Sequence, residues 1–135
     1  ALGNFTNTVS LYNVESVTGG NNSDVVYVKD TEISGGQYFL GTGMDYLNFE
    51  KAATATVSSV ETLVGSAYDD NITISGQYTG VAIDLGTGQD TLTIGSASTL
   101  TAVNIENING SSGADYIVLS GSTNTTVNLG SGNDT

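Results

Sequence analysis

The stretch Val81–Ile94, VAIDLGTGQDTLTI, holds a complete structural unit of this chain. Large apolar residues occupy every second position of VAIDL (81–85), a glycine-rich turn GTGQD (86–90) follows, and the alternation resumes in TLTI (91–94). Alternation with period two is typical of a β-strand that buries one face. The stretch therefore predicts two short strands joined by a tight turn that ends in an aspartate.

This unit recurs along the chain, which predicts a repeat architecture. The turn motif returns as LGTGMD (40–45), LGTGQD (85–90) and LGSGND (129–134). A second motif returns as VESVTG (14–19), VETLVG (60–65) and IENING (105–110). The spacing divides the sequence into three units of about 45 residues, 1–46, 47–91 and 92–135, which we interpret as one repeat domain and a segment of a longer solenoid.

An aspartate ends each of six successive turns, and apolar residues stand two and four positions after the first five of them. The six are Asp24, Asp45, Asp70, Asp90, Asp115 and Asp134. A coil of two short strands cannot bury its apolar face alone, whereas stacked coils pair each strand with its equivalent in the next coil. We therefore expect an all-β fold, a right-handed parallel β-roll or β-solenoid of about six coils, with all the glycine-aspartate turns on one edge. The segments 51–64 and 95–109 are interpreted as longer connections with a bend or bulge near Val60.

Composition limits the classes of partner. The 135 residues include 14 acidic and two basic ones, for a formal net charge of -12, and they include no His or Cys. So few cations argue against nucleic acid and anionic membrane surfaces. The sequence has no apolar run of the roughly 18 residues that a membrane-spanning helix needs, so direct membrane insertion is not expected. Without His, Cys or Arg, we do not expect an enzyme.

The aspartate column predicts a bound cation. Carboxylates stacked about 5 Å apart repel by roughly 3 kcal/mol per pair at an effective dielectric constant near 20. Lys29 and Lys51 are too few to neutralise them. Calcium accepts six to eight oxygen ligands in flexible geometry, whereas zinc and copper favour the absent His and Cys. We therefore expect about five Ca²⁺ ions between six turns. The candidate ligands are the six aspartates with Asp69, and the glycine turns at Gly41, Gly43, Gly86, Gly88, Gly113, Gly130 and Gly132.

The segment GTGQDTLT (86–93) resembles the repeats-in-toxin (RTX) nonapeptide G-G-x-G-x-D-x-U-x. The segment NIENINGSSGAD (104–115) is similar to RTX-type surface and S-layer sequences. Leu40, Leu85 and Leu129 stand where the nonapeptide has its first glycine. The resemblance implies a calcium-binding β-roll and an extracellular or cell-surface location. It also implies an S-layer protein or RTX adhesin whose partners are neighbouring repeats or identical subunits.

The predicted function is a calcium-stabilised structural module that stays unfolded in low-calcium cytosol and folds outside the cell. One alternative is an accessory module of an exported hydrolase or epimerase. Another is an ice-binding adhesin, in which Thr42, Thr87 and Ser131 begin an outward array with Met44, Gln89 and Asn133 beside them. In that array every second coil breaks the pattern.

Two readings of the acidic residues stay open. The aspartates serve either as calcium ligands or as caps of their own turns. Glu15, Glu61 and Glu106 recur at one repeat position, as extra ligands, as an inward polar column or as solvated side chains. The solvated position is favoured for the glutamates, because a glutamate is almost never buried without a partner.

Overall fold

The computed structural model describes residues 1–121 and 124–135, and the chain folds into two parallel β-sheets of seven strands each. One sheet, here the odd sheet, has the order β1-β3-β5-β7-β9-β11-β13, and the other, the even sheet, has the order β14-β12-β10-β8-β6-β4-β2. None of the described residues forms a helix that could cross a membrane.

The strands of the odd sheet are β1 (Asn7–Leu11), β3 (Asp24–Val28), β5 (Tyr46–Phe49), β7 (Thr62–Ser66), β9 (Thr79–Gly86), β11 (Thr99–Val103) and β13 (Tyr116–Ser120). Those of the even sheet are β2 (Ser16–Thr18), β4 (Ile33–Phe39), β6 (Ala53–Ser58), β8 (Asn71–Ile74), β10 (Thr91–Ile94), β12 (Asn107–Asn109) and β14 (Thr126–Asn128).

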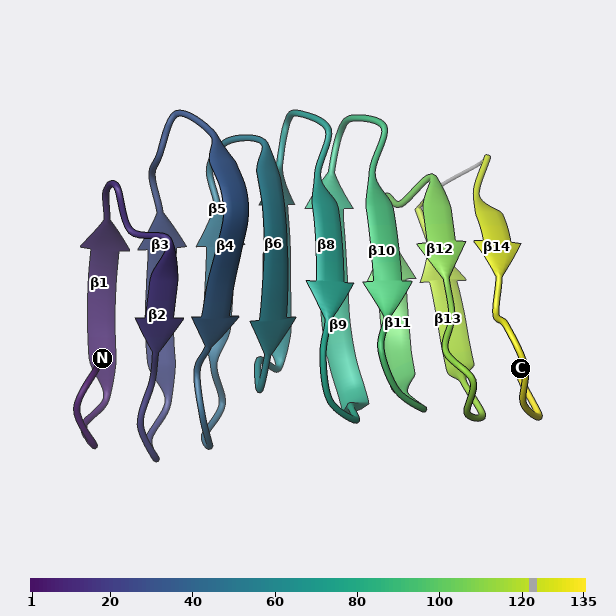
Figure 1. Cartoon of the computed structure of the whole chain (residues 1–135), viewed down its shortest axis with the longest axis horizontal. Helices are drawn as coiled ribbons and strands as arrows, with labels where there is room; N and C mark the ends of the chain where they lie inside the picture. The colour runs from purple at the N-terminus through teal and green to yellow at the C-terminus, as the bar shows by residue number, and fades with distance from the viewer. Residues whose placement is uncertain (122–123) are drawn as a thin grey trace.

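The chain winds as a solenoid, with each strand of one sheet followed by a strand of the other. In Figure 1 the even strands run downward in front, the odd strands run upward behind, and the chain advances from left to right, so the coil is right-handed. Seven strands per sheet correspond to six steps between successive coils. The predicted all-β parallel solenoid of about six coils is confirmed.

The core lies between the two sheets and is filled by alternate residues of strands β2 to β12, whereas β1, β13 and β14 at the two ends contribute no fully buried residue. Ile72 on β8, Ile83 on β9 and Leu92 on β10 are fully buried. Each such side chain contributes roughly 1.5–3 kcal/mol relative to an exposed position. The rings of Tyr38 and Phe49 meet edge to face in the N-terminal half of the core, with centroids 5.2 Å apart.

The sequence unit and the structural coil have different lengths. The segments predicted as connections, 51–64 and 95–109, contain β6 with the start of β7, and β11 with β12. The motifs VESVTG, VETLVG and IENING therefore form β2, β7 and β12, five strands apart. One unit of about 45 residues makes five strands, or two and a half coils, so successive units start on opposite sheets.

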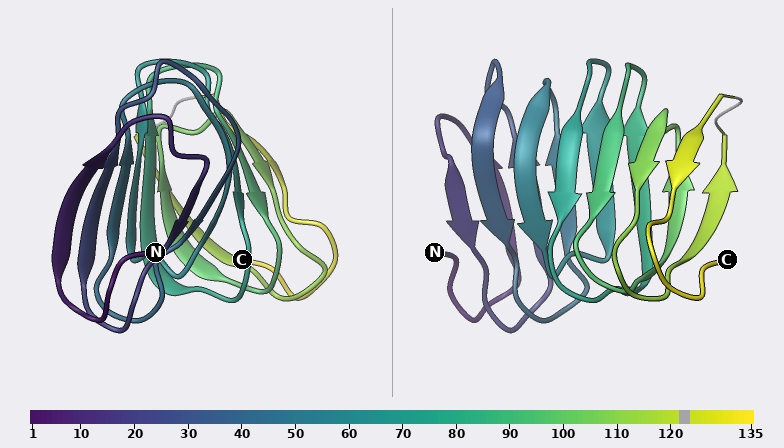
Figure 2. Two further views of the ribbon diagram at one scale, coloured as in Figure 1. Left: turned by 60° about the vertical axis from the view of Figure 1, so that its left-hand side comes forward. Right: turned by 45° about the vertical axis from the view of Figure 1, so that its right-hand side comes forward.

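This half-coil offset contradicts the prediction of a single edge for the aspartate turns. We call the edge where even strands lead into odd strands the lower edge, and the opposite one the upper edge, as they lie in Figure 1. The turns that end at Asp24, Asp45, Asp115 and Asp134 lie on the lower edge, and those that end at Asp70 and Asp90 lie on the upper edge. Figure 2 shows both edges along the stack. The polar turn predicted over 120–124 includes residues 122–123, which lie outside the described part.

Candidate functional site

The six aspartate turns form three stacked pairs. Turn pair I joins 19–24 and 40–45 on the lower edge, turn pair II joins 65–70 and 85–90 on the upper edge, and turn pair III joins 110–115 and 129–134 on the lower edge. In each pair the second turn donates a backbone hydrogen bond to the first. The three bonds are Thr42 N to Gly20 O at 3.0 Å, Thr87 N to Ser66 O at 3.2 Å and Ser131 N to Ser111 O at 3.3 Å.

The predicted glycine positions give the second turn of each pair its shape. Gly86 and Gly88 have φ values of 93° and 154°. The equivalents are Gly41 at 100°, Gly43 at 145°, Gly130 at 86° and Gly132 at 150°. A Cβ atom on Gly86 would lie 2.0 Å from the Ser66 carbonyl oxygen, closer than any real contact. Only glycine therefore allows this turn to rest on its neighbour. Gly113 lies in the first turn of turn pair III, where an added Cβ would meet Ala97 at 2.8 Å.

Within a pair, the second aspartate accepts a hydrogen bond from the backbone of the first. Asp45 Oδ1 accepts from Asp24 N at 2.7 Å, and Asp90 Oδ1 accepts from Asp70 N at 2.8 Å. Turn pair III repeats this contact, with Asp115 N donating to Asp134 Oδ1 at 2.9 Å. The first aspartate of each pair accepts a similar hydrogen bond from the preceding coil. The donors to Asp24, Asp70 and Asp115 are Asn7 N, Ala53 N and Ser98 N, in that order. The aspartates thus connect coils rather than only closing their own turns.

Two of the three repeated glutamates extend these ladders. Glu61 Oε2 accepts from Asp45 N at 2.7 Å, and Glu106 Oε2 accepts from Asp90 N at 2.9 Å. Both side chains are half-buried, so the expectation of a solvated position is wrong for them, whereas Glu15 is exposed. The sequence carried a signal for this arrangement, since each of these glutamates follows an aspartate by 16 residues. That spacing is one short coil.

The second carboxylate oxygens fall into two classes. Asp70 Oδ2 accepts from Ser66 N at 2.8 Å and from Ser66 Oγ at 3.1 Å. Asp115 Oδ2 accepts from Ser111 N at 2.9 Å and from Ser111 Oγ at 3.1 Å. Among the residues that the structure describes, Oδ2 of Asp24, Asp45 and Asp90 is buried without a hydrogen-bond partner. A buried charged oxygen without a partner costs free energy unless a counter-charge reaches it.

Burial also changes the acidity of these groups. It raises the pKa of Asp90 to about 6, although the hydrogen bond from the Asp70 backbone opposes the shift. Burial raises the pKa of Asp45 as well, against the hydrogen bond from Asp24 and with the charge of Glu61 adding to the increase. The pKa of Asp70 is also raised overall, because the effect of burial exceeds the opposing effect of the hydrogen bonds from Ser66 and Ala53. The carboxylates thus favour either a proton or a nearby cation.

Neither lysine supplies that counter-charge. Lys29 pairs with Glu50 at 2.5 Å on the surface, and Lys51 lies 5.0 Å from the centre of the Tyr68 ring. The predicted ligand Asp69 is exposed, and its Oδ1 accepts from Gln89 N at 2.9 Å. It therefore braces the two turns of turn pair II from outside.

The three turn pairs differ in the oxygen ligands that they could offer to calcium. Turn pair I offers two buried unpartnered oxygens on adjacent coils, turn pair II offers one, and the half-buried Asp134 ends turn pair III. In the described part of the chain, no group of three or more His, Cys, Asp or Glu side chains is placed to hold a metal. An ion at a turn pair would thus need backbone carbonyl oxygens besides carboxylates, a mixture that calcium accepts.

The turn residues predicted as an ice-facing array do not lie together. Thr42 and Ser131 lie far apart along the lower edge, and Thr87 lies on the upper edge. The half-coil offset between units separates them, so the array expected at the turns does not exist.

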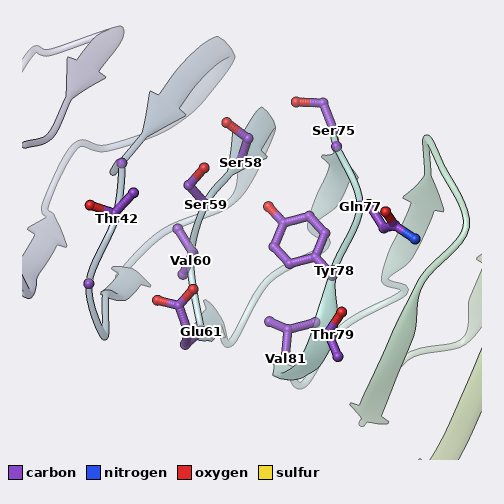
Figure 3. Close-up of a pocket in the computed structure, with 13 residues that line it drawn as sticks. Thr42, Ser58, Ser59, Val60, Glu61, Ser75, Gln77, Tyr78, Thr79 and Val81 are labelled. Carbon is purple, nitrogen blue, oxygen red and sulfur yellow. The ribbon is translucent and has the colours of Figure 1, made fainter. Parts of the chain in front are cut away.

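A groove of about 640 Å³ opens on the lower edge beside turn pair I. It lies where the short turn 59–61 recedes between the longer turns 40–45 and 75–78 (Figure 3). Ser59 adopts a left-handed conformation at φ 55°, as do its repeat equivalents Asn13 and Asn104. The lining is rich in hydroxyl groups, and Glu61 is the one carboxylate among the lining residues.

No family model, curated protein or solved structure matches this chain. The structure is a parallel β-solenoid of about six turns, an architecture compatible with a β-roll repeat.

Proposed function

We propose that this chain is a calcium-stabilised structural module of a secreted, cell-surface protein of the S-layer or RTX-adhesin kind. The observation that carries the proposal is the set of buried, unpartnered oxygens on Asp24, Asp45 and Asp90. They lie in a chain of net charge -12 whose two lysines are engaged elsewhere.

The physical reason is charge neutralisation at the turn pairs. A divalent cation offsets the repulsion between stacked carboxylates and supplies the missing partner of each unpartnered oxygen. Because turn pair I has two such oxygens, it is the strongest candidate, followed by turn pair II. The aspartates form three separate turn pairs and not the single predicted column that would hold about five ions. With one ion at each pair, the expected number falls to about three.

The binding would couple to folding. The turn pairs exist only when coils stack, so an ion that binds them adds its binding free energy to the stability of the folded chain. A module of this kind is least stable where calcium is scarce and gains stability outside the cell. Neighbouring repeats or identical subunits in a surface assembly are the partners that suit such a rigid solenoid.

The test is a thermal melt followed by far-UV circular dichroism, in EGTA and in millimolar calcium, together with a count of bound ions. We expect calcium to raise the melting temperature and magnesium to raise it less. The double variant Asp24→Asn/Asp45→Asn should lose much of the calcium response, whereas Glu50→Gln, which removes a surface charge, should keep it. Identical melts in EGTA and calcium, with no bound ion, would overturn the proposal.

A further inference from the structure

The outer face of the even sheet carries two straight rows of short polar side chains. Parallel pairing aligns one row through Thr54, Asn71, Thr91, Asn107 and Thr126, and a second through Gln37, Thr56, Thr73, Thr93, Asn109 and Asn128. Each even-numbered strand from β6 to β14 therefore presents the pattern Thr/Asn-x-Thr/Asn outward. From β6 to β12 the residues between them point into the core and are apolar, whereas Val127 on the terminal strand β14 is exposed.

The sheet fixes the spacing of this lattice. Neighbouring strands lie about 4.8 Å apart, and residues two positions apart along a strand lie roughly 6.6–6.8 Å apart. The register is unbroken from β6 to β14, so the polar groups form a rectangular grid. Threonine is β-branched and stiff at χ1, which holds its hydroxyl and methyl groups in place.

The polar groups of the grid are free to bind something outside the protein. Among the described residues, the one grid side chain with a hydrogen bond inside the chain is Asn128, whose Oδ1 accepts from Gly130 N. The strands β4, β6, β8, β10, β12 and β14 are described in full, and none of their residues is charged. In a chain with 14 acidic residues, this is a neutral face.

The outer face of the odd sheet is different. Its outward positions mix Val25, Tyr27, Tyr46 and Val64 with the carboxylate of Asp84. Tyr27 and Tyr46 contact each other, with ring centroids 5.9 Å apart. The regular neutral grid is thus a property of one face and not a consequence of the solenoid in general.

We propose that the even-sheet face binds the surface of ice. The grid is extended and periodic, and the hollows of the surface lie at the turns rather than on these strands, so the partner it suits is itself flat and periodic. A neutral crystal of water offers hydrogen-bond donors and acceptors at a fixed repeat. Many weak contacts to one solid add up as in multivalent binding. Insoluble polysaccharide is a poorer match, because the rows lack the aromatic rings on which sugar rings stack.

The experiment measures thermal hysteresis and incorporation into a growing ice hemisphere, with the full chain at saturating calcium and its folding checked by circular dichroism. We expect both signals for the native chain and their loss in Thr73→Tyr, at the centre of the grid. Thr101→Tyr, on the odd sheet, is the matched control and should keep them.

Absence of both signals in the folded native chain would overturn the ice proposal and leave the calcium proposal standing. Equal loss in Thr73→Tyr and Thr101→Tyr would also overturn it. Retention on cellulose or chitin without any effect on ice would replace ice by a polysaccharide as the partner.

Discussion

Turn pairs I and II share one backbone arrangement, yet they satisfy their buried carboxylates differently. In turn pair II, Ser66 donates twice to Asp70 Oδ2. In turn pair I the equivalent residue is Gly20, and Asp24 Oδ2 is buried without a partner in the described part of the chain. One repeat motif can therefore complete its own hydrogen bonds or leave an oxygen for an external cation.

Packing explains why turn pair I has a glycine at this position. A Cβ atom on Gly20 would lie 2.5 Å from the Gly3 carbonyl oxygen. A serine there would collide with the N-terminal segment that crosses this turn. The segment that packs against the turn thus determines whether a serine can stand at this position and donate to the aspartate carboxylate.

The largest effect we predict comes from the stacking that both pairs share. Gly86→Ala places a methyl group 2.0 Å from Ser66 O, at a φ of 93° that alanine resists. We expect a loss of more than about 3 kcal/mol in the free energy of unfolding, or failure to fold. Urea denaturation followed by circular dichroism measures this loss.

Gly76→Ala is the control. Gly76 has a φ of 95°, but a Cβ atom added there would meet nothing within 4 Å, so only the backbone strain of about 1 kcal/mol remains. Equal losses would show that strain, and not stacking, requires glycine.

The next prediction contrasts the two classes of carboxylate directly. In EGTA, Asp45→Asn should stabilise the fold, because it removes a buried charge with an unpartnered oxygen. Asp70→Asn should destabilise it by about 1–3 kcal/mol, because the new amide cannot accept from Ser66 N. Opposite signs in thermal melts would sharpen the comparison between the pairs. The same sign for both variants would remove the distinction.

The pH dependence of stability without metal follows from the raised pKa values. Asp90 has a pKa of about 6 in the folded chain against 3.8 in the unfolded chain, so folding binds a proton in this range. Its contribution to stability is complete below about pH 3.8 and is lost as the pH rises through about 6. Melts in EGTA should therefore show higher stability at pH 5 than at pH 7, and Asp90→Asn should flatten the profile. Calcium should weaken this trend, because it competes with the proton.

The sequence predicted the coil and its aspartates but not their placement on two edges. Alternation such as VAIDL made the strands visible, and parallel stacking follows from their repetition. Strand β6, with sequence ATATVS, was missed because two of its inward residues are the small Ala53 and Ala55. Six coils in three units imply four strands per unit, whereas the structure has five, and only an even number would keep every turn on one edge.

The partners of the carboxylates were even less visible, because they depend on contacts between coils. Ser66 and Gly20 differ by one hydroxymethyl group, and no local rule assigns that group to an aspartate four residues later. The role of Glu61 was missed for a related reason, since its distance of 16 residues from Asp45 has meaning only when the short coil is known.

Ser66→Ala gives the smallest predicted effect and makes turn pair II resemble turn pair I. The variant removes the hydroxyl that donates to Asp70 Oδ2 and accepts from Tyr68 N at 3.1 Å, and it keeps the backbone donor of residue 66. The loss of these two exposed or half-buried hydrogen bonds, one of them to a charged group, predicts a decrease of about 1–2 kcal/mol in EGTA. If a cation binds the less satisfied carboxylate, calcium should restore more stability to this variant than to the native chain, as paired melts would show. A calcium response equal to that of the native chain would mean that the serine hydroxyl and the ion do not compete for the same oxygen.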